Sequence, residues 1–409
     1  MIYLILPRGN NFGWGVCGKY LVREISDIRQ ITYVTEDFGV HDIGDEFEYH
    51  FLKSRLADTR EATDIRSGAT KQVRFPILQA IGSQALMPWG PEIHGTFKAG
   101  YTFFEENILK QEYIRNGKNN FDLIITGSTW CEDVLRNHGL ENVTTVIQGI
   151  DQQLFNPFHS EKEIYRDNFL VFSGGKFEIR KGQDIVIRAY KVLQDRHQDV
   201  ILVNSWFNMW GESMRTMSAS PYIKFNITSN DYVPGMNTTL ADNGIDIRRV
   251  ITMLPRPNAL MAKIYKNTDV GLFPNRCEGG TNLVLMEYMA CGKPVIASYS
   301  SGHKDIINND NALLLERMKP ITIKRNENKI AEWDDPDLDE TVERLEWAYQ
   351  NRDALRSYGL AAGNTLKKLT WKRSAAQFVE IIEEHTHHQE ESRQVNTLHK
   401  KQDQCTVSS

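Results

Sequence analysis

The chain has 409 residues, enough for two or three domains that each have a core of their own. Hydrophobic residues make up 41% and charged residues 25%, values close to the globular norm that exclude a wholly disordered protein. The formal net charge of −5 gives no support to nucleic-acid binding as the main function, because a phosphate backbone requires a strongly basic face.

No apolar run approaches the roughly 18 residues that a membrane-spanning helix needs. The N-terminal segment MIYLILPRGNN lacks the basic region and cleavage site of a signal peptide, so we expect it to form a buried first strand. The five cysteines include no C-x-x-C pair, so neither a disulfide scaffold nor a zinc site is expected. These features favour a cytoplasmic location.

The N-terminal part of the chain repeats a unit in which a short apolar strand, a turn and an amphipathic helix follow one another. Strands that alternate with helices are typical of parallel sheets with helices on both faces. We expect strands over Ile2–Leu6, Ala99–Phe104, Leu123–Thr126 and Val143–Gln148, a glycine-rich loop over Arg8–Gly15, and helices over Lys19–Ile25 and Cys131–Asn137.

The same unit recurs in the second half, where Gly292 is the expected C-terminal cap of the last helix. Two runs of this pattern predict an α/β fold with two Rossmann-like domains, each built on a doubly wound parallel sheet. The predicted elements are strands over Leu170–Ser173, Val200–Asn204, Val270–Pro274 and Val295–Ser298, and helices over Asp184–Gln194 and Asn282–Cys291.

The polar segment Asp151–Asn168 separates the two sets of strands and is the expected linker. We therefore expect an N-terminal domain over residues 1–155 and a C-terminal domain over residues 168–365, facing a cleft that binds a ligand. Residues 366–384 are expected to form a helix that packs back on the N-terminal domain, and residues 385–409 a disordered tail. The tail's histidines are expected to be solvated rather than to bind a metal: His385, His387 and His388.

The segment NRCEGGTNLVLMEYMACGKPVIAS carries the most informative chemistry. It places Glu278, Gly279 and Gly280 at the mouth of a helix that opens near Thr281 or Asn282, where backbone N–H groups and the helix dipole favour an anion. Glu287 stands in an apolar run, and a carboxylate buried there requires hydrogen-bond donors such as a ribose diol. The alternative is that Glu287 lies on an exposed face of the helix.

The stretch from Glu287 to Ser298, EYMACGKPVIAS, resembles the retaining GT-B glycosyltransferases of family four, also called glycosyl transferases group 1. Their signature is E-x7-E followed by a similar tail, and the resemblance implies that Glu287 holds the nucleotide ribose and Glu278 orients the donor sugar. The spacing here is E-x8-E, since seven residues before Glu287 lead back to Gly279. We expect Gly279 and Gly280 to absorb the extra residue.

The segment SGGKFEIRKGQD resembles the family pattern G-R-x4-K-G, in which two cations neutralise the donor diphosphate. Lys176 takes the arginine position and Lys181 the lysine position, and Arg180 is an additional cation. With the backbone amides of residues 279–282 they would stabilise a leaving diphosphate, whose charge grows in the transition state. The alternative is a solvated basic turn.

The N-terminal domain offers weaker signals. The resemblance implies that its first loop approaches the donor phosphates, with Gly13 and Gly15 as candidates; the alternative is a glycine turn that only packs a helix tightly. Many family members carry a histidine after a strand that here ends in Glu105, so Glu105 is the candidate for a sugar or acceptor contact and His94 its competitor. His303 is expected to lie toward the cleft and to support the site residues without contacting the ligand itself.

The resemblance implies a GT-B glycosyltransferase that moves a sugar from a nucleotide-diphosphate donor to an acceptor hydroxyl with retention, without a metal or other cofactor. The D-x-D at Asp337–Asp339 follows Pro336 and is interpreted as a helix start, not a metal motif. The acceptor class stays open between a glycan, a small molecule and a lipid-linked molecule, the last of which would allow peripheral membrane association. A non-catalytic nucleotide-sugar-binding protein and a nucleotide-sugar epimerase are the alternative functions.

Overall fold

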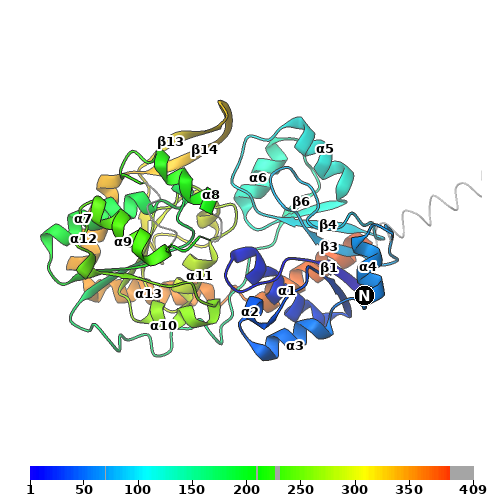
Figure 1. The fold of residues 1–409 in the computed structure, drawn as a ribbon, viewed down its shortest axis with the longest axis horizontal. Helices are drawn as coiled ribbons and strands as arrows, with labels where there is room; N and C mark the ends of the chain where they lie inside the picture. The colour runs from blue at the N-terminus through cyan, green and yellow to red at the C-terminus, as the bar shows by residue number, and fades with distance from the viewer. Residues whose placement is uncertain (70, 209–210, 226–230, 387–409) are drawn as a thin grey trace, which may run out of the picture.

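The computed structural model describes residues 1–69, 71–208, 211–225 and 231–386, which form two lobes side by side (Figure 1). The N-terminal lobe is built on a six-stranded sheet in the order β2-β1-β3-β4-β5-β6, in which every pair is parallel. Its strands are β1 (Ile2–Ile5), β2 (Ile31–Val34), β3 (Ile77–Ala80), β4 (Lys98–Thr102), β5 (Leu123–Thr126) and β6 (Val143–Thr145).

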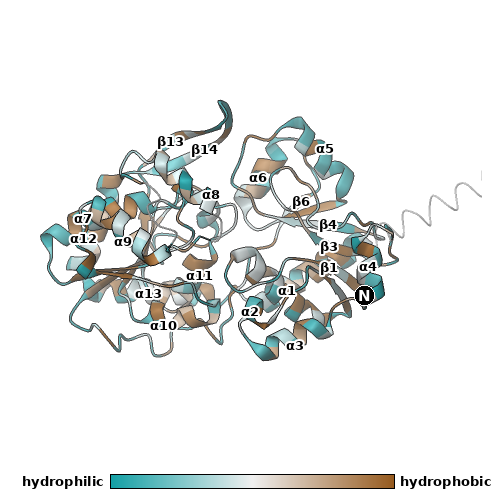
Figure 2. Cartoon of the chain, viewed as in Figure 1, coloured by the Kyte–Doolittle hydropathy of each residue, from teal (hydrophilic) through white to brown (hydrophobic). Residues whose placement is uncertain are grey.

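The C-terminal lobe repeats the plan with the order β12-β11-β10-β7-β8-β9, again parallel throughout. Its strands are β7 (Phe169–Gly174), β8 (Val200–Ser205), β9 (Val250–Thr252), β10 (Val270–Phe273), β11 (Val295–Ser298) and β12 (Leu313–Leu315). Figure 2 shows these strands in brown and the outward helix faces in teal, because strands covered on both faces are apolar almost throughout. The prediction of two parallel α/β sheets is confirmed.

Helices cover both sheets. In the N-terminal lobe they are α1 (Gly13–Ile28), α2 (Val40–Ile43), α3 (Glu46–Ser54), α4 (Thr59–Arg66), α5 (Gln111–Asn120) and α6 (Thr129–Asn137). In the C-terminal lobe they are α7 (Gln183–Arg196), α8 (Gly211–Met214), α9 (Tyr232–Asp242), α10 (Met261–Lys266), α11 (Leu283–Ala290), α12 (Leu338–Gln350) and α13 (Arg352–Leu366).

The first helix begins earlier than the sequence predicts. The expected helix over Lys19–Ile25 starts at Gly13, so Gly13, Gly15 and Gly18 are helical and not part of a loop. A Cβ on Gly18 would lie 1.9 Å from the Pro7 carbonyl oxygen, so α1 packs directly against the chain that leads into it. Gly18 and Gly15 permit this close packing of helix against backbone, whereas a Cβ on Gly13 would meet no atom closer than 3.9 Å.

Two further elements differ from expectation. The strand expected over Ala99–Phe104 ends at Thr102, and Phe103 leaves the sheet to stack on Trp14 with ring centroids 4.1 Å apart. The antiparallel hairpin of β13 (Met318–Arg325) and β14 (Asn328–Pro336) was not predicted; it projects from the C-terminal lobe toward the other lobe (Figure 1). Its partly exposed strands lack the continuous apolar run that marked the buried ones.

The chain crosses between the lobes twice. After residue 150 it enters the C-terminal lobe, and near residue 370 it returns, so that the Ile150 amide donates to the Leu369 carbonyl at 2.9 Å. A helix over residues 371–386 then packs into the N-terminal core, where Trp371 stacks on Tyr20 with centroids 5.3 Å apart (Figure 1). The tail expected over residues 385–409 lies outside the described residues from residue 387 onward.

Candidate active site

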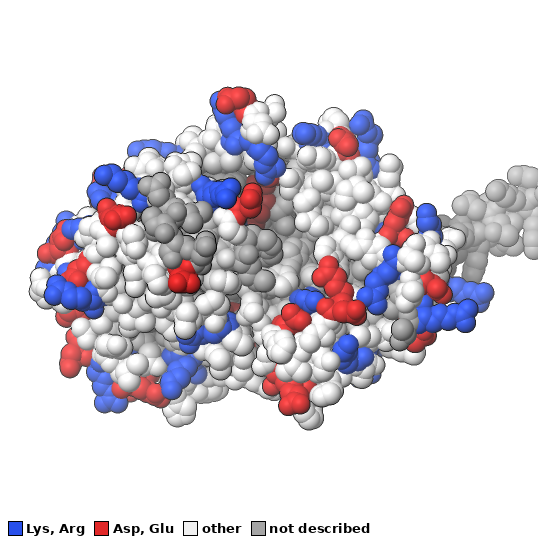
Figure 3. Space-filling view, in the orientation of Figure 1, with Lys and Arg blue, Asp and Glu red and all other residues white. Residues whose placement is uncertain are grey.

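A cavity of about 460 Å³ lies between the two lobes. It is lined by the segments that follow the carboxyl ends of β1, β3 and β4 in one lobe and of β7, β8, β9 and β10 in the other. Open α/β sheets bind ligands at these ends, and the volume falls within the usual range for a small-molecule site. Acidic and basic side chains are interspersed over the face shown in Figure 3, including the rim of the groove between the lobes.

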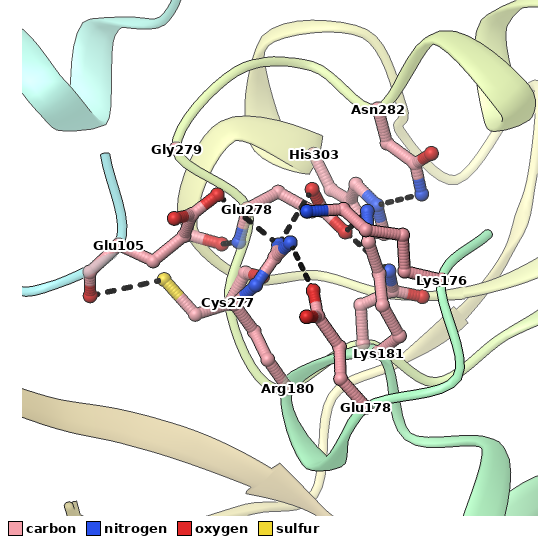
Figure 4. A network of polar contacts seen from close by, with 12 residues as sticks. Glu105, Lys176, Glu178, Arg180, Lys181, Cys277, Glu278, Gly279, Asn282 and His303 are labelled. Carbon is pink, nitrogen blue, oxygen red and sulfur yellow. Dashed lines mark hydrogen bonds and ion pairs between the residues drawn. The ribbon is translucent and has the colours of Figure 1, made fainter. Parts of the chain in front are cut away.

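The C-terminal lobe presents a cluster of buried ions to this cavity (Figure 4). The Glu278 carboxylate accepts from the Lys181 ammonium at 2.6 Å and from the Arg180 guanidinium at 3.1 Å. Burial opposes the charge of Glu278, but Lys181 and Arg180 outweigh it and lower the pKa of Glu278 to about 2. Glu278 is therefore ionised and paired at neutral pH.

Hydrogen bonds and an ion pair that the sequence did not predict hold the loop that carries Glu278 in place. The Asn275 side chain donates to the Glu278 carboxylate, and the Glu278 amide donates to the Ser301 hydroxyl at 2.8 Å. Fully buried Arg276 pairs with Asp184 at 2.8 Å and also donates to the Ile179 carbonyl at 2.5 Å. Arg276 thereby ties the loop of Glu278 to the turn of Arg180 and Lys181.

Glu287 lies at another part of the same cavity, on α11. Its carboxylate accepts from the Tyr265 hydroxyl at 2.9 Å and from the Asn258 side chain. Burial raises the pKa of Glu287 to about 8, against the opposing effect of these two donors. Glu287 is buried and faces the cavity, so the alternative of an exposed helix face is wrong.

The N-terminus of α11 opens into the cavity, where the first N–H groups of a helix have no intrahelical partner. Asn282 precedes the helix with φ 62° and holds the turn in the left-handed region. The Asn282 side chain donates to Nε2 of His303 at 3.2 Å, because Nδ1 of His303 is 3.1 Å from the Ser298 carbonyl and must be the protonated nitrogen. Burial lowers the pKa of His303 to about 4, so His303 supports this turn as a neutral side chain.

The two glycines before α11 lie against the N-terminal lobe. A Cβ on Gly279 would sit 2.2 Å from the Phe104 carbonyl oxygen, and the Gly279 carbonyl accepts from the Ser128 hydroxyl at 2.6 Å. Gly280 lines the cavity, where its Cβ would be 3.1 Å from the Gln148 side chain. Gly279 thus lies at the contact between the lobes, and Glu278 and Gly280 line the cavity.

Several predicted donor residues lie off the cavity. Gly15 packs on Gly9, where a Cβ would be 2.8 Å from the backbone nitrogen, and its neighbour Gly13 is the one that lines the cavity. The Thr281 hydroxyl contacts the Met286 sulfur at 2.9 Å inside the C-terminal lobe. Gly279 contacts the other lobe as described above. Close packing against backbone explains the glycine at positions 15 and 279, and the Thr281 hydroxyl has a partner inside its own lobe.

The remaining predicted residues gather around Arg180. Lys176 lines the cavity beside Lys181, and Glu105 of the N-terminal lobe lies 3.3 Å from the Arg180 guanidinium. His94 is exposed and lies outside the lining of the cavity as far as the described residues show it. The structure therefore brings Glu105, and not His94, to the residues of the C-terminal lobe.

Residues 168–326 match the family model of glycosyl transferases group 1. Similar curated proteins include an uncharacterized glycosyltransferase of Methanocaldococcus jannaschii, 22% identical over 289 residues, and a D-inositol 3-phosphate glycosyltransferase of Paenarthrobacter aurescens, 23% identical over 263 residues. The matches cover 70% and 62% of this chain but 59% and 55% of those proteins, so the chain spans little more than half of their length.

The matched part of the C-terminal lobe is similar to the glycosyl transferases group 1. Solved structures with the same overall fold include the sucrose-phosphate synthase of Thermosynechococcus elongatus, with a TM-score of 0.64 and 15% identity over 94% of this chain and 98% of that one. The Anabaena protein HepE in complex with UDP and glucose has a TM-score of 0.62 and 14% identity over 93% and 99% of the two chains. These likenesses show the GT-B fold that the motifs predicted.

The C-terminal lobe also places four residues at the site that the motifs did not indicate: Asn258, Tyr265, Asn275 and Ser301. Asn258 and Tyr265 contact Glu287, and Asn275 and Ser301 contact Glu278. No spacing in the sequence predicts these contacts. Asp337 caps α12 by accepting from the Glu340 amide at 2.9 Å, as expected of a helix start.

Within the described ranges, no helix combines the length and apolar character needed to cross a membrane. Over the same ranges, no three His, Cys, Asp or Glu side chains are grouped so that they could hold a metal ion.

Proposed function

We propose that the protein transfers a sugar from a nucleotide-diphosphate donor to an acceptor hydroxyl, with retention of the anomeric configuration. The observation that carries this proposal is that Lys181, Glu278 and Glu287 line one cavity together with the N-terminus of α11. A cation and a helix N-terminus suit a diphosphate, and a carboxylate beyond them suits a ribose diol.

In this arrangement Lys181 and Lys176, with Arg180, offset the charge that grows on the departing diphosphate. Glu287 accepts hydrogen bonds from the ribose hydroxyls, and Glu278 orients the donor sugar. Because the side chains and the helix N-terminus supply positive charge themselves, we propose that transfer needs no metal ion. We propose that closure of the lobes on the bound donor excludes water and limits donor hydrolysis.

The comparisons support the donor class. HepE was solved in complex with UDP and glucose, and a trehalose-6-phosphate synthase with a TM-score of 0.62 was studied for glycosyl transfer with retention. We infer the same class of donor and the same stereochemistry here. For retention we propose a front-face route, in which the leaving phosphate assists the acceptor hydroxyl, since the described cavity shows Glu278 paired with Lys181 and not positioned as a free nucleophile.

A panel of UDP-, GDP- and ADP-sugars tests the proposal. We expect one donor to raise the unfolding temperature and to release its nucleoside diphosphate faster when a sugar or polyol acceptor is added, equally with and without EDTA. Proton NMR of the product should show the donor's anomeric configuration. Conversion of the donor alone to an epimer, or binding without any release of nucleoside diphosphate, would contradict the proposal.

A further inference from the structure

Three carboxylates surround the single guanidinium of Arg180, and one of them comes from the other lobe (Figure 4). Glu178 lies 2.6 Å from it and Glu278 3.1 Å, both on the C-terminal lobe. Glu105 reaches it from the loop after β4 at 3.3 Å. Arg180 itself is buried, so its guanidinium is largely shielded from solvent.

Glu105 is the least firmly held of the three. One guanidinium nitrogen of Arg180 already donates to the Cys277 carbonyl at 3.0 Å and to Glu278, which uses both of its hydrogens. Glu105 approaches that same nitrogen, so charge rather than a hydrogen bond of its own holds it there. The side chain of Glu105 is 32% exposed, against 10% for Glu178 and 5% for Glu278.

The charges grouped around Arg180 balance while Glu105 is in place, and Arg256, at another part of the cavity lining, adds one more positive charge. Lys176, Arg180 and Lys181 supply three positive charges, and Glu105, Glu178 and Glu278 supply three negative ones. A diphosphate brings about two further negative charges to the same cations. Glu105 and a diphosphate therefore compete for Arg180, and Glu105 is the one of the three carboxylates that comes from the N-terminal lobe and is the most exposed.

We propose that Glu105 is an internal competitor of the donor diphosphate: it yields Arg180 when the donor binds and returns to it to displace the nucleoside diphosphate product. The inference rests on the proposed function for its biological meaning, but the competition itself concerns any diphosphate. In this proposal Glu105 sets the affinity of the site around Arg180 for a diphosphate and does not contact the sugar.

The main chain of Glu105 keeps it near the cavity throughout. Its carbonyl accepts from the Trp333 indole N–H of β14 at 2.8 Å, and the Asn107 side chain donates to the Glu332 carbonyl of the same strand at 3.0 Å. Hydrogen bonds to the hairpin thus anchor the loop, while the carboxylate of Glu105 alone changes partner.

The test measures binding of inorganic pyrophosphate by isothermal titration calorimetry to the full chain. Glu105→Gln removes the competing charge and keeps the size of the side chain, so its affinity for pyrophosphate should rise about three- to tenfold over wild type. Glu105→Asp keeps the charge and should stay within about twofold of wild type. Glu106→Gln is the matched control, because Glu106 pairs with Arg325 of the hairpin and not with Arg180.

The outcomes separate this inference from the proposed function. Tighter binding to Glu105→Gln alone supports the competition, even if no nucleotide sugar is turned over. Equal or weaker binding to Glu105→Gln overturns it, as does the absence of binding to wild type and variant alike. With a donor that is turned over, Glu105→Gln should also show a lower inhibition constant for the nucleoside diphosphate product; a purely structural defect would raise that constant.

Discussion

The Tyr265 hydroxyl donates to the Glu287 carboxylate at 2.9 Å, within a core where both side chains are buried. Tyr265 lies on α10 and Glu287 on α11, so the bond fixes one helix against the next at the wall of the cavity. Asn258 donates to the other carboxylate oxygen from the segment before α10. A carboxylate this well buried and held by donors is prepared to accept two further hydroxyls from a ligand.

Replacing Tyr265 tests whether its hydrogen bond holds Glu287 in position to bind a ligand. Tyr265→Phe removes one donor from Glu287 and should weaken binding of the preferred nucleoside diphosphate about two- to tenfold, in line with the loss of one buried hydrogen bond. Tyr288→Phe is the control: Tyr288 is equally buried nearby, but its hydroxyl bonds to Thr268 at 2.8 Å. If both variants weaken binding alike in calorimetry, Tyr265 acts through general packing and not through Glu287.

The raised pKa of Glu287 predicts how stability depends on pH. The folded pKa is about 8 against an ordinary value of 4.5, so the folded chain keeps a proton that the unfolded chain loses between these values. The contribution of Glu287 to the free energy of unfolding is therefore fully present below pH 4.5. It is lost as the pH rises to 8, by about 1.4 kcal/mol per pH unit. Glu287→Gln cannot titrate and should lack this slope.

Urea unfolding of wild type and Glu287→Gln at pH 5 and at pH 8 measures the effect. We expect the variant to gain stability relative to wild type between the two values, by a few kcal/mol. An equal pH dependence in both proteins would show that Glu287 has an ordinary pKa.

The fully buried pair of Arg276 and Asp184 predicts a large effect on folding. Asp184→Asn leaves the buried Arg276 charge paired with Asp335 but without its two contacts to the Asp184 carboxylate, and should cost roughly 1.5–3 kcal/mol of unfolding free energy. Glu343→Gln, which breaks the exposed pair of Glu343 with Arg317, should cost less than about 1 kcal/mol. Similar losses in both variants by chemical denaturation would contradict the assigned role of the buried pair.

The sequence was sufficient for the fold because parallel strands buried on both faces leave unbroken apolar runs. Leu123–Thr126 and Val295–Ser298 were predicted with their observed bounds. Strands such as β2, which is only partly buried, left no such run. The hairpin of β13 and β14 was missed for the same reason, since most of its residues are partly or fully exposed.

For the site, the sequence located the charged groups but not their partners. Motif spacing located Lys181, Glu278 and Glu287, because each lies on a helix or close to its first residue, where the sequence pattern predicts the local structure. The pairing of Glu105 with Arg180 joins residues on different lobes, and its geometry depends on how the lobes meet. A pattern of short-range spacing carries no information on such a contact.

The central claim is that a diphosphate binds beside Lys181 at the N-terminus of α11. Calorimetric titration of wild type, Lys181→Ala and the exposed control Lys118→Ala with UDP, GDP and ADP tests it most directly. The account predicts that one nucleoside diphosphate binds wild type and Lys118→Ala equally, and binds Lys181→Ala at least tenfold more weakly, with transfer lowered by two orders of magnitude or more. Undiminished affinity in Lys181→Ala, or no binding of any of the three to wild type, would contradict it.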